Sequence, residues 1–397
     1  MKKIKQNSAI RIFFGLVLVF LFAACNPRAR IDANKPESRG EGRGTKIGIM
    51  CSPLEWGEEN YRMVERILAE FGKDKFIVNI MPADGDVQTI VSLASKMAND
   101  PDCGVIVFNE AAVGCIAGMQ AVREINPNIL LITIMPGEDP VEIENLSDLV
   151  AQQAFEELGA SVVDAANEKG LKVLVFEVPA DQLGTTMVQR RLAGLKARCD
   201  ELGIKLIETT LPSQTDANNR PALEQAAKED VYSKIAQYGE NVGFFPHTSF
   251  IYIPMITAML DKKAGYLVLP CDAGPFSPAY SDAFKISAPG GNVLDIAWTN
   301  SAIAKKCEEY GMVGRFGNWD FALLSSFMYA SVRYGIDYQD GKVGRNDVET
   351  LVKYYMEINN VDDTDCFYRL YKREDGTDVQ HHAMIWGKIK WYGENLL

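Results

Sequence analysis

Three carboxylates stand where apolar segments end, and they are the residues best suited to chemistry. Glu110, Asp181 and Asp272 follow the apolar segments 105–108, 173–178 and 266–270. Two carboxylates at a suitable separation could hydrolyse a glycosidic bond. They could equally hydrogen-bond a ligand, cap a helix or face solvent. Because they lie in different loops, the sequence gives no separation, and it favours ligand binding over catalysis.

Histidine is scarce, which limits metal and acid–base chemistry. The chain has three His residues, His247 and the pair at 381 and 382. His247 precedes Thr248 and Ser249, but adjacent loop residues seldom face one another and no third triad member is indicated. We therefore expect His247 and Thr248 to hydrogen-bond a ligand. The sequence predicts no catalytic residue, metal site or bound cofactor, and G-x-S-x-G, H-E-x-x-H and Walker motifs are absent.

Aromatic and amide side chains suggest the kind of ligand. A flat ring system is held well between aromatic rings, with polar groups fixing its orientation. Rings in expected loops and helix starts are Trp56, Tyr61, Phe250, Phe276 and Trp319. Each could instead pack in the core or at a hinge. Side chains that could hydrogen-bond a polyol or a pyrimidine edge are Asn109, Gln182, Arg190 and Thr248, although Arg190 and Arg191 could also form a solvated helix face.

The elements that position these residues alternate between short apolar strands and amphipathic helices. This rhythm is typical of parallel strands covered on both faces. It predicts an α/β fold of two tandem doubly wound, Rossmann-like lobes with a cleft between them. We expect a first lobe at 46–148, a second at 149–290 beginning with a helix over 149–169, and a C-terminal segment at 291–397 that completes the lobes. The aromatic C-terminal part predicts strands paired about Asp375 and Gly376.

The first 25 residues indicate export. Basic residues precede an apolar stretch over 12–22, which is too short for a permanent membrane span and is followed by Ala23, Ala24 and Cys25. Phe22–Cys25 is similar to a bacterial lipobox, although Leu is usual where Phe22 stands. We expect a signal peptide at 1–24, lipidation of Cys25, and a flexible tether at 25–45 that holds the protein at the membrane, facing the periplasm or the exterior.

Composition narrows the function further. Hydrophobic residues make up 47% and charged residues 24%, as in ordinary globular proteins. The formal net charge of −12 disfavours nucleic acid as a partner. Seven Cys residues remain besides Cys25 without any C-x-x-C, which favours buried free thiols, and a disulfide stays an alternative.

An exported lipoprotein with two tandem lobes resembles the type I periplasmic-binding-protein fold over residues 46–397. The segments 46–50 and 56–61, Pro246–Thr248 and Pro270–Ala273 resemble a family of spirochaetal and clostridial lipoproteins. One branch of that family is regarded as the riboflavin-capturing component of an ATP-driven importer. The resemblance implies a solute-binding receptor that carries riboflavin as a transported ligand to ABC permease subunits. A nucleoside- or sugar-binding receptor, a surface hydrolase and a sensor or adhesin remain alternatives.

Overall fold

A computed structural model describes residues 43–395, apart from residues 55, 112, 216, 271–273, 290–293 and 374. The expected signal peptide, Cys25 and nearly all of the expected tether lie outside the described residues. None of the helices in the described part is long and apolar enough to cross a membrane.

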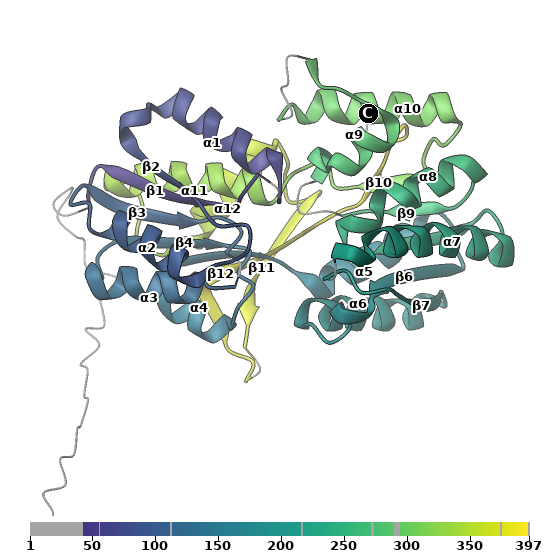
Figure 1. The fold of residues 1–397 in the computed structure, drawn as a ribbon, viewed down its shortest axis with the longest axis horizontal. Helices are drawn as coiled ribbons and strands as arrows, with labels where there is room; N and C mark the ends of the chain where they lie inside the picture. The colour runs from purple at the N-terminus through teal and green to yellow at the C-terminus, as the bar shows by residue number, and fades with distance from the viewer. Residues whose placement is uncertain are drawn as a thin grey trace, which may run out of the picture. The chain divides into compact units, whose positions relative to one another are not determined.

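The first sheet has seven strands in the order β11-β12-β5-β4-β3-β1-β2 (Figure 1). All neighbours pair in parallel except β11 and β12, which form an antiparallel hairpin. The expected pairing about Asp375 and Gly376 is thereby confirmed. The strands are β1 (Lys46–Cys51), β2 (Phe76–Ile80), β3 (Cys103–Phe108), β4 (Leu130–Ile134), β5 (Leu149–Gln153), β11 (Cys366–Lys372) and β12 (Asp378–Gly387).

Helices cover both faces of this sheet because alternate strand residues point to opposite sides. Ile47 and Ile49 of β1 join a core with α1 (Glu58–Phe71), α11 (Leu324–Gln339) and α12 (Val348–Asn359). Met50 joins the opposite core with α2 (Val87–Ala98), α3 (Cys115–Ile125) and α4 (Pro140–Leu146). The continuous apolar strands of the sequence are therefore strands buried on both faces.

The second sheet has six strands in the order β13-β10-β9-β8-β6-β7. They are β6 (Val173–Pro179), β7 (Lys205–Leu211), β8 (Val242–Pro246), β9 (Tyr266–Val268), β10 (Phe316–Asn318) and β13 (Lys390–Trp391). One face packs on α5 (Phe155–Glu168) and α6 (Thr186–Leu202). The other packs on α7 (Arg220–Tyr238), α8 (Tyr252–Lys262), α9 (Pro278–Phe284) and α10 (Ile296–Tyr310).

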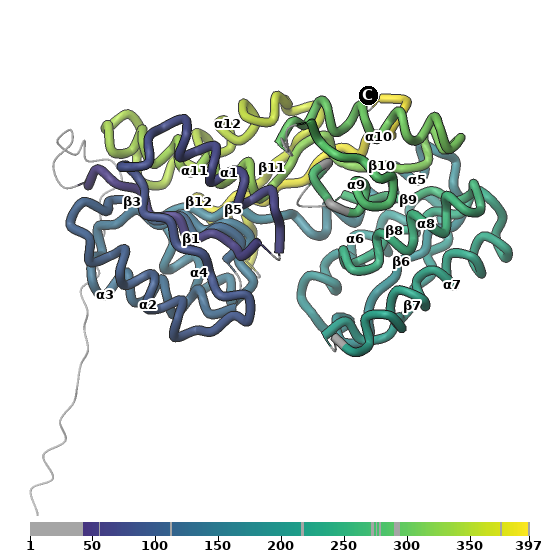
Figure 2. Tube along the Cα trace, turned by 45° about the horizontal axis from the view of Figure 1, so that its top comes forward, coloured from purple at the N-terminus to yellow at the C-terminus, as the bar shows by residue number. Residues whose placement is uncertain are grey.

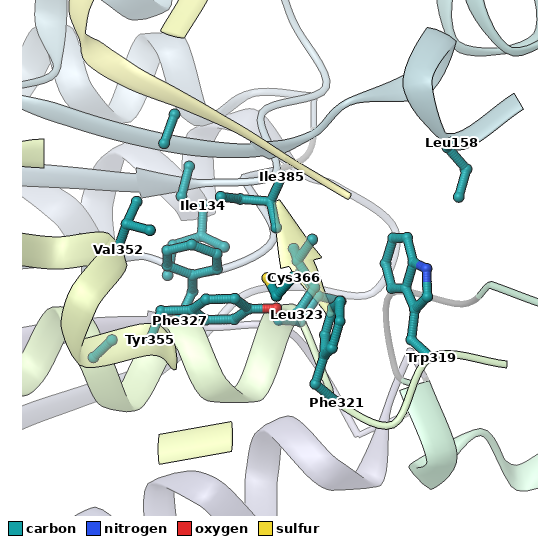
Figure 3. Close-up of a cluster of buried hydrophobic side chains, with 14 of the residues drawn as sticks. Ile134, Leu158, Trp319, Phe321, Leu323, Phe327, Val352, Tyr355, Cys366 and Ile385 are labelled. Carbon is teal, nitrogen blue, oxygen red and sulfur yellow. The ribbon is translucent and has the colours of Figure 1, made fainter. Parts of the chain in front are cut away.

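The chain passes between the two sheets three times, and the later passages can be followed by colour in Figure 2. The passages run from β5 to α5, from β10 to α11, and from β12 to β13. Trp319 and Phe321 of the second passage stack with ring centroids 5.0 Å apart. Figure 3 shows these two rings side by side, with Leu158 of α5 on the far side of Trp319. A single apolar cluster therefore runs through both lobes.

The predicted lobe boundary at 149 is wrong. Leu149–Gln153 is strand β5 of the first sheet, and the helix begins only at Phe155. A short apolar segment followed by a helix has no distinct periodicity, so the two elements merged into one predicted helix. The segment 291–397 divides between the lobes, since α10, β10 and β13 belong to the second while α11, α12, β11 and β12 belong to the first.

The cysteines of the described part are buried free thiols, as the sequence favours. They are Cys51, Cys103, Cys115, Cys199, Cys307 and Cys366. Cys25 and Cys271 lie outside the described residues.

Candidate functional site

Each sheet has a point where the connections leaving two neighbouring strands diverge. In the first sheet, β1 leads over one face to β2 and β3 leads over the other face to β4. In the second sheet, β6 and β8 diverge in the same way. Ligands of open α/β sheets bind in the crevice beyond the carboxyl ends of such strands. The loops after β1, β3, β6 and β8 are therefore the candidate site.

Most sequence-predicted site residues lie on these four loops or on the helices that follow them. Trp56 and Tyr61 follow β1, and Asn109 and Glu110 follow β3. In the second lobe the corresponding residues are Asp181 and Gln182 after β6, and His247 and Thr248 after β8.

A polar network links the β1 and β3 loops of the first lobe. Asn60, buried in the first turn of α1, donates from Nδ2 to Ser52 Oγ at 3.0 Å and to Glu110 Oε2 at 3.3 Å. Glu110 has a φ of 56°, in the left-handed region that non-glycine residues rarely adopt. The network therefore holds a carboxylate in a strained turn at the end of β3, where strain often marks function.

Two buried amides have bonding capacity left over. Asn109 is fully buried, and neither side-chain atom has a hydrogen-bond partner among the described residues. Gln153, at the end of β5, is fully buried, and its Nε2 has no partner in the described part of the chain. Buried polar groups are normally satisfied, so these two need an explanation, such as a ligand or water.

Arg191 of α6 joins the first sheet to the second. Its Nη2 donates to Gln153 Oε1 at 2.6 Å, and its Nη1 donates to the His247 carbonyl oxygen and Nδ1, each at 3.3 Å. Its guanidinium also lies 5.5 Å from the Phe155 ring centroid. Burial and the neighbouring Arg191 charge lower the pKa of His247 to about 3. His247 is therefore neutral at physiological pH and keeps one ring nitrogen as an acceptor.

The loop after β6 carries a well-solvated carboxylate. Desolvation raises the pKa of Asp181, but donors from Gln182 and the Gln214 backbone outweigh it and lower the pKa to about 2. Asp181 and Gln182 are thus bonded to each other within one exposed turn. In the loop after β8, the Thr248 hydroxyl accepts from the Phe250 backbone at 3.5 Å.

Apolar side chains remain exposed over the same four strand ends. Fourteen large apolar side chains of the described residues are exposed, and seven of them lie in the loops after these four strands or in the first turn of the helices that follow. The seven are Leu54, Trp56, Tyr61, Val113, Leu183, Phe250 and Ile253. Exposed apolar groups at the strand ends where open sheets bind ligands favour a binding surface.

Three predicted site residues are placed differently, and a fourth lies outside the described residues. Trp319 is fully buried, and its indole N–H donates to the Gly387 carbonyl at 3.1 Å, so its ring belongs to the core. Arg190 faces Tyr371 of β11. Phe276 is half-buried after β9, and Asp272 lies outside the described residues.

Three residues of the site were not predicted from the sequence, namely Asn60, Gln153 and Arg191, although helical spacing could have found two of them. Arg191 shares the buried stripe of α6 with Leu192 and Leu195. Asn60 likewise shares a stripe with Met63, Val64 and Ile67. A polar residue on an apolar stripe is buried for a reason, because burial without a partner is costly. Gln153 gave no such signal, since β5 itself was predicted as a helix.

No group of three or more His, Cys, Asp or Glu residues in the described part could hold a metal ion. Glu110 and Asp181 lie in different lobes, and each is bonded within its own lobe.

The sequence model of a family described as "Protein of unknown function (DUF3798)" matches residues 45–317. The chain belongs to this family. The match covers the first lobe up to β5 and the whole second lobe as far as β10, including every loop of the candidate site. Among curated proteins, none matches this DUF3798 chain.

Solved structures share the fold of this DUF3798 member. A candidate transcriptional regulator from Clostridium difficile 630 is 17% identical, with a TM-score of 0.76 over 88% of this chain and 99% of its own. A sugar ABC transporter protein from Actinomyces odontolyticus ATCC 17982 is 11% identical, with a TM-score of 0.51 over 77% of this chain and 86% of its own. The DUF3798 chain has a type I periplasmic-binding-protein-like fold, as the sequence predicts.

Proposed function

We propose that this protein is a solute-binding receptor, tethered to the membrane through Cys25, that passes a small ligand to an ABC permease. The observation that carries the proposal is the set of exposed apolar side chains over β1, β3, β6 and β8, such as Trp56 and Phe250, beside buried polar groups. Binding pockets for small molecules combine apolar walls with a few well-placed polar groups.

The chemistry of the polar groups favours a neutral ligand. The groups are the amides of Asn109 and Gln153, the neutral imidazole of His247 and the Thr248 hydroxyl. Arg191 already binds Gln153 and His247, so its charge is partly engaged. Riboflavin fits this set, since its flat ring system suits Trp56 and Phe250 and its polyol chain suits amides. A nucleoside or a sugar is the second candidate.

Capture would work through movement of the two lobes about the three passages that connect them. A ligand that touches the loops of both lobes binds the closed arrangement more tightly and shifts the population toward it. Asn109 and Gln153 are fully buried in this structure. We infer that they become accessible when the lobes separate and are covered again with the ligand in place.

The hydrolase alternative requires two carboxylates acting on one bond. Glu110 bonds to Asn60 within the first lobe, and Asp181 bonds to Gln214 within the second. We therefore propose binding without turnover. A sensor or adhesin would differ in having a partner other than a permease.

The test is a titration of the chain lacking residues 1–25. Quenching of riboflavin fluorescence is followed in parallel with a thermal-shift panel of nucleosides and sugars. We expect one ligand per chain, micromolar or tighter affinity, and recovery of the ligand unchanged. A released product would support the hydrolase, and binding of a sugar without any quenching would replace riboflavin as the ligand.

Two ring deletions and one control locate the binding. Trp56→Ala and Phe250→Ala remove exposed rings at the candidate site, and each is expected to weaken binding about tenfold, as loss of a ring contact worth about 1–1.5 kcal/mol implies. Tyr368→Ala removes an equally exposed ring from β11 and should leave the affinity unchanged. Equal weakening in all three variants would argue against the candidate site.

A further inference from the structure

A pocket lies away from the four loops of the candidate site. It has a volume of about 580 Å³, and its walls come from α5, α6, strand β11 and the start of β12. The second lobe therefore supplies one wall and the first lobe supplies the other. We call it the β11 pocket; its charged lining residues are Glu156, Arg190, Arg369, Lys372, Arg373 and Asp378.

The lining is basic although the chain is acidic overall. Four cations and two carboxylates line the β11 pocket, whereas the whole chain has a formal net charge of −12. A concave surface with an excess of one charge concentrates ions of the opposite sign. Because Glu157 and Glu144 lie against two of these cations, the pocket suits an anion only at a cation that has no carboxylate partner.

Two of the four cations are already neutralised by partners outside the lining. Arg369 pairs with Glu157, and Arg373 donates from Nε to Glu144 Oε2 at 2.8 Å. Lys372 is highly exposed and approaches Asp378 only at 3.9 Å. Lys372 therefore keeps most of its donor capacity for another group.

Arg190 has no ion pair with any described residue. Its guanidinium lies 5.6 Å from the ring centroid of Tyr371 and is 3.5 Å from the phenol oxygen. Tyr371 is itself buried and stacks on the fully buried His382 with centroids 4.7 Å apart. This stack fixes the platform on which the guanidinium rests, so Arg190 is presented in a defined position with donors unused.

We propose that the β11 pocket binds a small polyvalent anion, carrying phosphate or carboxylate groups, between Arg190 of the second lobe and Lys372 of the first. A guanidinium can bind two oxygens of such a group side by side, and an ammonium adds a point charge. Glu156 and Asp378 disfavour a ligand that fills the whole pocket, so the anion is expected to be small.

The test uses inorganic phosphate and citrate as probes. Isothermal titration of the chain lacking residues 1–25, at constant ionic strength with chloride as the compensating ion, should show saturable binding of citrate, of phosphate or of both. Arg190→Gln should weaken that binding at least tenfold, and Lys372→Gln about threefold. Arg62→Gln removes one cation from exposed helix α1 and should change nothing.

Hydrogen exchange on the unaltered chain gives an independent readout if a variant folds poorly. Citrate should slow exchange in β11 and in the first turns of α6 without slowing it in the loops after β1 and β3. Absence of saturable binding to either probe, or equal binding by Arg190→Gln and Arg62→Gln, would overturn the proposal. So would protection confined to the loops of the candidate site.

The phosphate group could belong to a free anion or to a lipid headgroup. Binding to lipid vesicles distinguishes these two sources. Vesicles containing phosphatidylglycerol are compared with vesicles of phosphatidylcholine alone. If the wild type binds only the anionic vesicles and Arg190→Gln abolishes this binding, the anion is a headgroup. If citrate or phosphate binds and the vesicles do not, the anion is a free solute. Vesicle binding that Arg190→Gln leaves intact, without binding of either free probe, would overturn the site.

Discussion

Glu177 of β6 is fully buried, and both of its carboxylate oxygens lack a hydrogen-bond partner among the described residues. Burial raises its pKa well above 4.5, and the charge of Asp230 on α7 raises the pKa further. A carboxyl group in this position is therefore held in its neutral form. Because its pKa differs between the folded and the unfolded chain, the free energy of unfolding depends on pH.

Replacing Glu177 by Gln should flatten the fall of stability with rising pH. Above about pH 4.5 the unfolded chain loses this proton while the folded chain keeps it, so the free energy of unfolding falls as pH rises. One such group contributes up to about 1.4 kcal/mol per pH unit. Urea unfolding between pH 5 and 8 measures the slope for Glu177→Gln, for the wild type and for the exposed α7 control Glu229→Gln. Equal slopes for all three would contradict the prediction.

His247 has the opposite dependence. Its pKa of about 3 lies below the ordinary 6.5, so the unfolded chain takes up a proton first as pH falls through this window. We expect the His247 ring signals in an NMR titration to stay unchanged between pH 5 and 8. Arg191→Met removes the neighbouring charge and should raise the pKa of His247. A wild-type midpoint near 6.5 would show that the ring is not enclosed with Arg191.

Gly387 is the last residue of β12 and begins the third passage between the sheets, where it packs against the rings of the second passage. A Cβ placed there would lie 2.4 Å from Cζ and 2.6 Å from Cε1 of Phe321, and 3.0 Å from Cδ1 of Trp319. Those rings are stacked on each other and fully buried, so neither can move away cheaply. The glycine is needed because two passages cross here.

Gly387→Ala is therefore expected to destabilise the protein by about 1–3 kcal/mol, the usual range for overpacking a core. Gly344→Ala is the matched control, because a Cβ there meets nothing within 4 Å. Denaturant unfolding of the two variants measures the difference. Equal stabilities would mean that the crossing passages pack more loosely than they do in this structure.

Much of the fold could be predicted because continuous apolar strands and amphipathic helices have distinct periods. The loops that carry Asn109, Glu110 and His247 could also be predicted, because ligands of open sheets bind at the carboxyl ends of the strands and the strands were recognisable. Strand β5 was predicted as part of a helix, because its five residues directly precede α5 and are too few to show a strand periodicity of their own. Trp319 was not predicted to be buried because its contacts include Gly387 of β12, which lies 68 residues further along the chain.

At the scale of the whole molecule, one apolar cluster includes residues from both sheets. It contains Ile47 and Ile132 of the first sheet, Leu174 and Phe176 of the second, and Trp319 between them. Lys390 adds polar links across the passages, because its Nζ contacts Asp320 at 2.6 Å and Asp365 at 2.7 Å. The lobes therefore share one core in addition to the separate core that each has on its other face.

Because the core is shared, the chain should unfold in one cooperative transition with coincident midpoints for helix content and tryptophan fluorescence. Trp319→Ala removes the ring at the centre of the shared cluster and should cost about 3–5 kcal/mol. It should also separate the midpoints, since each lobe then relies on its other cores around α2 and α3 or α7 and α8. Trp298→Ala, in the first turn of α10 and outside the shared cluster, should leave the midpoints coincident. Two transitions in the wild type would mean that the passages act as a loose hinge and that closure on a ligand, rather than the shared core, holds the lobes together.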